Sequence, residues 1–260
     1  MKIAVLIPAA GLSTRFGSKD KLNADLGGRP LLMRTVEFFT KRDEITQIIV
    51  AGPSTSFDSF KDRFAAALSF HGVTIVQGGE HRWESVQNAL AEVDPTVDRI
   101  AIHDAARPAL SNALFDTLLA ASAQVDAVAP ACALTGTIKR ASLNETPLEE
   151  EEDIADAIFG ETGKAKIHTH EIIETVDRSG LWEVQTPQLF ETSLLIRAYQ
   201  SPITINPTDD AQVVELHGEV VHLVEGESRN IKVTTQSDLH LVRAILGIKD
   251  APKRAPHKRF

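Results

Sequence analysis

The stretch IAVLIPAAGLSTRFGSKDK, from Ile3 to Lys21, decides the fold of this chain. It opens with an apolar run from Ile3 to Ile7, which has the length of a buried parallel strand. Pro8 ends the strand, because proline cannot donate a hydrogen bond to a neighbouring strand. The small residues that follow let the backbone approach a ligand, and we expect their N–H groups to bind anionic oxygen: Ala9, Ala10, Gly11, Ser13 and Gly17.

Two cations, Arg15 and Lys21, stand in this otherwise small loop, with Lys19 between them. A strand, a small-residue turn and fixed cations suit a triphosphate. The loop is neither a P-loop, which ends in Gly-Lys-Ser/Thr, nor a dinucleotide fingerprint, because Ser13 stands where that fingerprint needs glycine. On these residues alone, an ordinary strand-to-helix connection with solvated cations stays open.

Apolar segments of strand and helix periodicity alternate beyond this loop. Helices are expected at 31–39, 57–68, 85–90 and 113–123, and strands at 46–52, 73–79, from 99 and at 127–134. Later elements are an ordered stretch at 175–190, a helix at 207–217, a strand at 220–226, a strand-like NIKVTT at 230–235 and a helix at 236–246. This alternation predicts a doubly wound, mostly parallel, Rossmann-like α/β sheet covered on both faces. Ligands of such sheets gather at the carboxyl ends of the strands.

Composition bounds the class of protein. With 260 residues and 43% hydrophobic content, the chain can bury a full core, and we expect a single domain over 1–248. The formal net charge of −9 argues against a nucleic acid as partner, because proteins that bind nucleic acids usually carry an excess of basic residues. A single cysteine, Cys132, excludes an internal disulfide and predicts a reducing, cytoplasmic location. No apolar run is long enough to predict a membrane span.

An arm is expected over 134–176, where the regular alternation stops. Its segment 143–163 holds eight acidic residues and neither lysine nor arginine. Such a block usually stays solvated, so we expect an acidic insert that is mobile and dispensable for catalysis, with a short helix at 154–159. The basic, proline-containing tail at 249–260 is expected to be disordered.

Two further motifs follow predicted strands. GGEHRWESV supplies backbone donors at Gly78 and Gly79 and polar groups at Glu80, Arg82 and Ser85, although a turn with a capped helix would explain the same residues.

In HDAARP, Asp104 comes just past a strand end, where a carboxylate can hold Mg²⁺ or hydroxyls. A simple pair between Asp104 and Arg107 that stabilises the turn is the competing interpretation. His103 fits a buried core position, and no catalytic role is assigned to it.

PAAG with Arg15 and Lys21, together with HDAARP, resembles the cytidylyltransferases that act on 2-C-methyl-D-erythritol 4-phosphate in the non-mevalonate isoprenoid pathway. Ser13 departs from that family, where glycine is usual, and Gly136 stands where the family usually has an acid. The resemblance implies CTP and a polyol phosphate as partners, Mg²⁺ or another divalent cation, and a homodimer whose arms exchange.

The resemblance also implies residue roles. It gives catalytic cations at Arg15, Lys21 and Lys232. It gives CTP contacts at Pro8, Ala9, Ala10, Gly11, Gly79, Glu80, Ser85, Asp104 and Ala105, with Asp104 also a metal ligand. It gives polyol phosphate contacts at Arg107, Thr137, Arg178, Thr186 and Asp209, with Thr137 and Arg178 acting across the dimer interface. Taken alone, Asp209 also fits a helix cap, and Lys232 also fits a solvated face.

The chemistry needs no general base, because a phosphate monoester is largely dianionic at neutral pH, with a second pKa of about 6. Three other functions stay open. One is cytidylyl transfer to another polyol phosphate, such as ribitol 5-phosphate. A dinucleotide-dependent oxidoreductase is disfavoured by Ser13 and the cations behind the loop. A non-catalytic nucleotide-binding protein, with the acidic insert as partner surface, is disfavoured by Arg15, Lys21 and Lys232 together.

Overall fold

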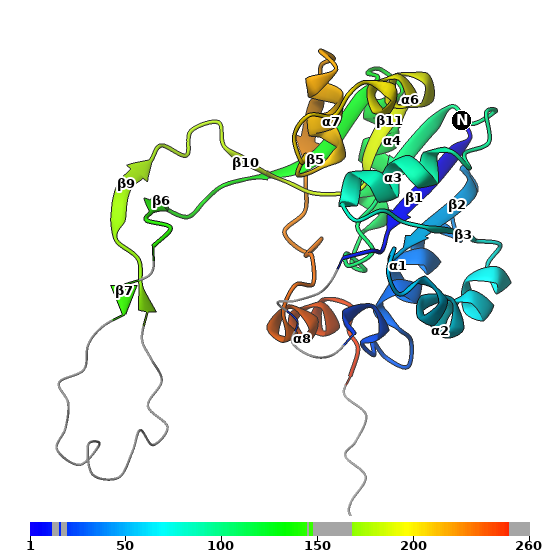
Figure 1. Ribbon diagram of the computed structural model, residues 1–260, viewed down its shortest axis with the longest axis horizontal. Coiled ribbons are helices and arrows are strands. Elements are labelled where there is room, and N and C mark those ends of the chain that lie inside the picture. The colour runs from blue at the N-terminus through cyan, green and yellow to red at the C-terminus, as the bar shows by residue number, and fades with distance from the viewer. Residues whose placement is uncertain (12–15, 17–19, 145, 148–167, 250–260) are drawn as a thin grey trace, which may run out of the picture. The chain divides into compact units, whose positions relative to one another are not determined.

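The structure is a computed structural model that describes the chain except for residues 12–15, 17–19, 145, 148–167 and 250–260 (Figure 1). The chain divides into two compact units, one formed by Met1–Cys132 and Val184–Phe260 and the other by Ala133–Glu183. The first unit carries most of the large sheet and all the described helices, and the second carries short antiparallel ribbons.

The large sheet has eight strands in the order β10-β5-β11-β4-β1-β2-β3, with β12 paired to β5. Their bounds are β1 Ile3–Pro8, β2 Ile45–Gly52, β3 Thr74–Gln77, β4 Arg99–Ile102, β5 Ala127–Ala133, β10 Trp182–Val184, β11 Gln188–Glu191 and β12 His222–Glu225. Strand β1 lies in parallel between β2 and β4. The pairs β2–β3 and β12–β5 are also parallel, whereas β11 runs antiparallel to β4 and β5. The predicted, mostly parallel sheet is therefore confirmed.

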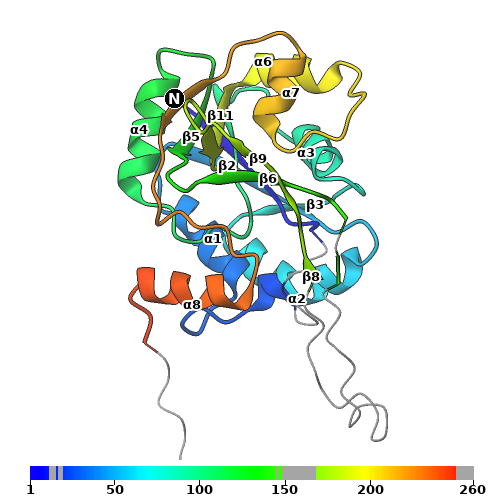
Figure 2. The same ribbon diagram turned by 90° about the vertical axis from the view of Figure 1, so that its left-hand side faces the viewer.

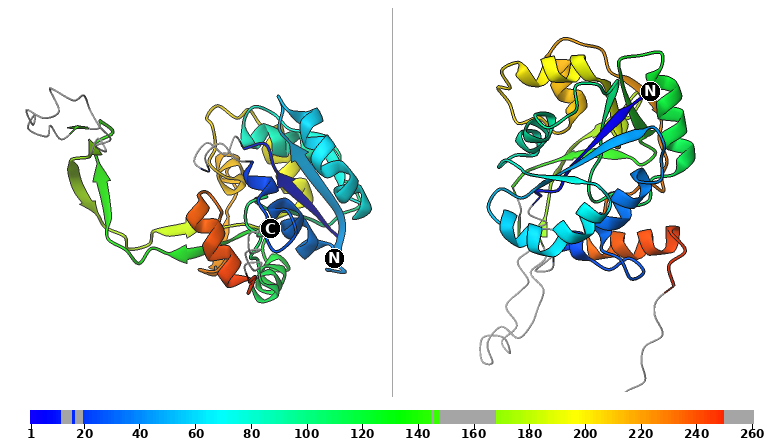
Figure 3. Two further views of the ribbon diagram at one scale, coloured as in Figure 1. Left: turned by 90° about the horizontal axis from the view of Figure 1, so that it is seen from below. Right: turned by 90° about the vertical axis from the view of Figure 1, so that its right-hand side faces the viewer.

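Helices cover both faces of this sheet (Figures 2 and 3). Their bounds are α1 Leu31–Phe39, α2 Phe57–Phe70, α3 Arg82–Leu90, α4 Asn112–Ser122, α6 Thr192–Gln200, α7 Asp210–Leu216 and α8 Gln236–Ile245, with a 3₁₀ turn, η2, at Lys21–Asn23. Alternate residues of β1 enter two cores. Val5 and Ile7 join the core of α1, α2, α4 and α8, and Ala4 and Leu6 join that of α3, α6 and α7. This division is the doubly wound arrangement that the sequence predicted.

Local chemistry explains where several helices begin. Ser111 caps α4, because its hydroxyl accepts a hydrogen bond from the Leu114 amide at 3.0 Å. Pro30 precedes α1, and Thr235 with Asp238 forms a capping box at the start of α8. At the end of β2, a Cβ on Gly52 would lie 2.8 Å from the ring of Phe60, so only glycine lets α2 pack there.

Some expected elements differ from the structure. The prediction that NIKVTT is strand-like is wrong, because residues 230–234 form no strand. This segment is instead bound to the loop after β4, where the Val233 amide donates to the Ala106 carbonyl. The helix expected from 207 begins at Asp210. Helix α6 and the antiparallel strand β11 were not predicted.

The second unit contains two antiparallel pairs of short strands. Strand β6, Ile138–Ala141, pairs with β9, Ile172–Val176, and β7, Thr146–Pro147, pairs with β8, His168–Thr169. Most of the acidic insert, the short helix expected at 154–159 and all but the first residue of the tail lie outside the described residues. Within the described ranges, no helix is both long and apolar enough to cross a membrane.

Candidate active site

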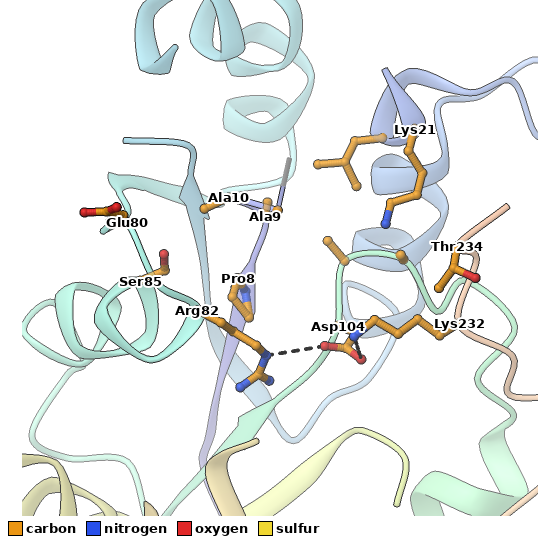
Figure 4. A pocket seen from close by; sticks show the side chains of 14 residues that line it. Pro8, Ala9, Ala10, Lys21, Glu80, Arg82, Ser85, Asp104, Lys232 and Thr234 are labelled. Carbon is orange, nitrogen blue, oxygen red and sulfur yellow. Dashed lines mark ion pairs between the residues drawn. The ribbon is translucent and has the colours of Figure 1, made fainter. Parts of the chain in front are cut away.

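A pocket of about 440 Å³ opens at the carboxyl ends of β1 and β4 (Figure 4). Its walls come from the loop after β1, the turn η2, the start of α3, the loop after β4 and the segment before α8. The lining residues are Pro8, Ala9, Ala10, Gly11, Lys21, Leu22, Glu80, Arg82, Ser85, Asp104, Ala105, Ala106, Lys232 and Thr234. The three predicted motifs therefore meet at one edge of the sheet.

Asp104 is the point on which three cations converge. Lys232 Nζ lies 3.0 Å and Arg107 Nε 3.1 Å from its Oδ2, while Arg82 Nε lies 3.6 Å from its Oδ1. Burial alone would raise the pKa of Asp104, but Arg82, Lys232 and Arg107 outweigh it and hold the pKa well below its usual range. The carboxylate therefore stays ionised, and the cluster keeps an excess of positive charge beside the pocket.

A buried network fixes the segment that carries Lys232 to the loop that carries Asp104. Arg107 donates to the Asn230 carbonyl at 2.7 Å, and the Asn230 amide side chain donates to the Thr186 carbonyl at 2.8 Å. The hydroxyl of Thr186 accepts from the Asp104 backbone amide at 3.0 Å. Arg107 and Thr186 thus hold Asp104 from behind and do not line the pocket.

His103 lies fully buried beneath this network. Its Nε2 is 3.0 Å from the Arg107 carbonyl and its Nδ1 is 3.1 Å from the Thr186 hydroxyl. Burial lowers the pKa of His103 to about 4, even though those hydrogen bonds and Asp104 favour the charged form. It is neutral at pH 7 and faces other protein groups, as expected of a core histidine.

The opposite wall depends on a glycine. The Gly79 amide donates to Ser85 Oγ at 3.1 Å, and the Ser85 hydroxyl donates to the His81 carbonyl at 3.2 Å. A Cβ on Gly79 would lie 2.2 Å from the Cβ of Glu84, which accepts from the His81 amide in the capping box of α3. The capped helix and the pocket wall are therefore one structure. Glu80 is exposed, on the side of the pocket away from Lys232.

The remaining predicted residues lie elsewhere. Asp209 caps α7, where its side chain accepts from the Gln212 amide at 2.9 Å, so the helix-cap interpretation describes its contacts. Thr137 and Arg178 belong to the second unit, where Arg178 donates to the Thr135 carbonyl. Arg15 lies outside the described residues.

Three polar or charged side chains in or directly behind the described pocket received no role from the sequence. Arg82 and Thr234 line the pocket, and Asp210 lies 2.7 Å from Arg82 Nη2. The signal for Arg82 was its place in GGEHRWESV, one residue inside a helix start, where a cation is unfavourable without a nearby carboxylate. Its partner Asp210 is distant in sequence and resembles an ordinary helix-start acid.

The donor set of the pocket limits how a metal ion is held. Across the part of the chain that the structure describes, no group of three His, Cys, Asp or Glu side chains is placed to hold a metal. Asp104 and Glu80 are the carboxylates among the lining residues. Mg²⁺ commonly binds through one or two carboxylates, several waters and substrate phosphates, and this pocket fits that mode alone.

The fold and the pocket define a nucleotidyltransferase of the Rossmann-like α/β type. A small-residue loop after the central strand meets Lys21 and Lys232 across a cavity, and the buried His103 beneath it contacts other protein groups and not the cavity. The model of the IspD family, 2-C-methyl-D-erythritol 4-phosphate cytidylyltransferase, matches residues 3–155 and 154–248.

Comparisons with individual proteins agree. The 2-C-methyl-D-erythritol 4-phosphate cytidylyltransferase of Rhodopirellula baltica is 34% identical over 256 residues, covering 94% of each chain. That of Bacteroides fragilis is 35% identical over 246 residues, covering 93% of this chain and 98% of the relative. The crystal structure of the Thermus thermophilus enzyme superposes with a TM-score of 0.70 at 29% identity, covering 95% of this chain and 100% of that one. The chain belongs to the 2-C-methyl-D-erythritol 4-phosphate cytidylyltransferase family.

Proposed function

We propose that the chain joins CTP and 2-C-methyl-D-erythritol 4-phosphate to give 4-diphosphocytidyl-2-C-methyl-D-erythritol and pyrophosphate. An oxygen of the sugar phosphate attacks the α-phosphorus of CTP, and the bond from that phosphorus to the oxygen bridging to the β-phosphate breaks. The observation that carries the proposal is the meeting of the small-residue loop, Lys21 and the Asp104–Lys232 pair in one pocket.

The protein's task in this reaction is electrostatic. The attacking phosphate is already largely dianionic, with a second pKa of about 6, so no side chain has to remove a proton. Two anions must instead be brought together and the charge crowding around the α-phosphorus stabilised. We assign this stabilisation to Arg15, Lys21 and Lys232.

The neutral walls of the pocket suit the nucleoside. We assign contacts with cytosine to the backbone from Pro8 to Gly11 and to Ser85, which line the pocket, and to Gly79, whose amide donates to Ser85 Oγ behind that wall. Asp104 and the Ala105 backbone are assigned to the ribose hydroxyls, while Arg107 and Thr186 hold Asp104 in place from behind.

Mg²⁺ is proposed as the cofactor, held mainly by the triphosphate with Asp104 as its protein ligand. When bound, the ion neutralises phosphate charge. We also propose a cytoplasmic homodimer in which the second unit completes the partner's site through Thr137 and Arg178. The chain holds a single cysteine, Cys132, and so forms no internal disulfide, which suits a reducing compartment.

Pyrophosphate release from CTP, followed with a panel of acceptors, tests this function. The panel holds 2-C-methyl-D-erythritol 4-phosphate, erythritol 4-phosphate and ribitol 5-phosphate, each with Mg²⁺ and with a chelator, and each repeated with ATP. We expect Mg²⁺-dependent turnover with the methylated acceptor and CTP, and little with ATP because a purine is too large for the pocket. Faster turnover with ribitol 5-phosphate would contradict the acceptor, and equal turnover with ATP would contradict the cytidylyl assignment.

A further inference from the structure

Asp210 places a fully buried carboxylate just behind the pocket. The Tyr199 hydroxyl donates to its Oδ1 at 2.6 Å, and Arg82 Nη2 lies 2.7 Å from its Oδ2. A buried carboxylate is costly unless it is both paired and hydrogen-bonded. Helix α7 already has its cap in Asp209, so helix capping gives no reason to bury a second acid at this point.

Arg82 explains the buried acid. As the first residue of α3, it occupies a position where the helix dipole disfavours a cation. Its guanidinium bridges Asp210 behind the pocket and Asp104 within it, and its side chain is only 25% exposed. Burial raises the pKa of Tyr199 well above its usual value, and Asp210 raises it further, so the phenol stays a hydrogen-bond donor.

The two oxygens of Asp104 have different partners. Oδ1 faces Arg82 at 3.6 Å, while Oδ2 accepts the shorter contacts from Arg107 and Lys232. Arg82 is closer to Asp210 than to Asp104. The side chain of Lys232 is 42% exposed. Among the contacts described, the ion pair with Asp104 is therefore the one that orients the Lys232 ammonium.

We propose that Asp210 and Tyr199 are positioning residues, which hold Arg82 back from Asp104 so that Asp104 can orient Lys232. The inference rests on the proposed function, in which Lys232 stabilises the charge at the α-phosphorus. If Asp210 loses its charge, Arg82 has one carboxylate left and closes on it, since guanidinium and carboxylate prefer a two-pronged pair. Asp104 then turns from Lys232, whose ammonium loses its alignment.

Steady-state kinetics on Asp210→Asn, Lys232→Ala and the double variant test this coupling. We expect Asp210→Asn to lower kcat roughly tenfold, a size typical of residues joined in one network, and to raise the KM for CTP, because Asp104 is also assigned to the ribose. In the Lys232→Ala background the same substitution should lower kcat no further. Equal losses in both backgrounds would overturn the proposal, because a merely structural defect adds independently of Lys232.

Tyr199→Phe is the gentler variant, and it decides the matter if Asp210→Asn does not fold. It removes only the hydroxyl, and we expect a smaller fall in kcat that again disappears in the Lys232→Ala background. Tyr199 lies in the last turn of α6, and Glu191 caps the start of the same helix. Glu191→Gln is therefore the matched control, because it removes the carboxylate cap and should lower Tm without changing kcat. Wild-type turnover in the same assay separates the two claims. An inactive wild type contradicts the proposed function, whereas an active wild type with unimpaired Asp210→Asn and Tyr199→Phe variants contradicts this inference alone.

Discussion

His103 couples the stability of the site to pH. Burial lowers its pKa to about 4, whereas the unfolded chain titrates near 6.5. Between these values the unfolded state binds a proton that the folded state does not, so stability is complete above about pH 6.5 and falls as the pH drops toward 4. The shift corresponds to about 3 kcal/mol at most. Urea unfolding at pH 7 and pH 4.5 measures it.

His103→Gln should remove this pH dependence, even though it lowers stability at pH 7 by disturbing the contacts with Arg107 and Thr186. The control His240→Gln changes an exposed histidine on α8 and should leave the dependence intact. Equal loss of stability between pH 7 and pH 4.5 in the wild type and His103→Gln would show that His103 titrates normally.

Individual site residues differed in how far the sequence could predict them. Asp104 and Lys232 were predicted because each lies in a motif with a recognisable pattern. Arg82 and Asp210 were not assigned roles, because their role depends on their contact with each other, and the two residues are 128 positions apart in the sequence. No local pattern marks such a pair.

At the scale of elements, the start of α3 tests how tightly the pocket wall is built. A Cβ on Gly79 would come 2.2 Å from Glu84 Cβ, so Gly79→Ala must displace the first turn of α3. Forced overpacking of this kind costs about 1–3 kcal/mol, and the shift also moves the Gly79 amide and Ser85 Oγ. We expect a lower Tm and a higher KM for CTP, measured by thermal unfolding and steady-state kinetics.

Gly136→Ala is the stability control for that change, because an added Cβ there meets nothing within 4 Å. If both variants melt at the same temperature as the wild type, the close contact at Gly79 does not constrain α3.

Elements with strong periodicity were predicted well. The helix expected at 31–39 and the apolar strand that begins at Ile3 match α1 and β1. In both elements the spacing of the apolar residues follows from which side chains are buried in the core. Strand β11 escaped prediction, since its four residues leave little pattern and its direction is set by its neighbours. NIKVTT has the composition of a strand, yet the contacts of Asn230 and Val233 with the loops after β4 and before β11 keep it irregular.

At the scale of the whole molecule, the sequence placed the motifs correctly because strand ends of a parallel sheet meet at one edge. It could not show how Thr137 and Arg178 reach a site, because they belong to a separate unit and their proposed target lies in a partner subunit. The proposed role of Thr137 and Arg178 therefore depends on the proposed homodimer.

Excision of residues 143–163 tests whether the acidic insert takes part in the reaction. The segment is poor in large apolar residues, so it offers little surface for a packed contact. Replacing it with a short Gly-Ser linker should leave kcat and the number of subunits in the assembly unchanged, as measured by turnover and light scattering. Loss of activity together with a change in mass would show that the insert supports assembly.

The central claim is that fixed cations around one pocket stabilise the charge at the α-phosphorus, and the kcat of Lys21→Ala and Lys232→Ala tests it most directly. Removing one preorganised stabiliser of this kind typically costs ~10²–10³-fold in kcat. Lys61→Ala is the control, because Lys61 lies exposed on α2 and pairs with Asp58 away from the pocket. With all three variants folded by circular dichroism, we expect large losses of kcat for Lys21→Ala and Lys232→Ala and none for Lys61→Ala. A near-normal kcat in both pocket variants would contradict the account.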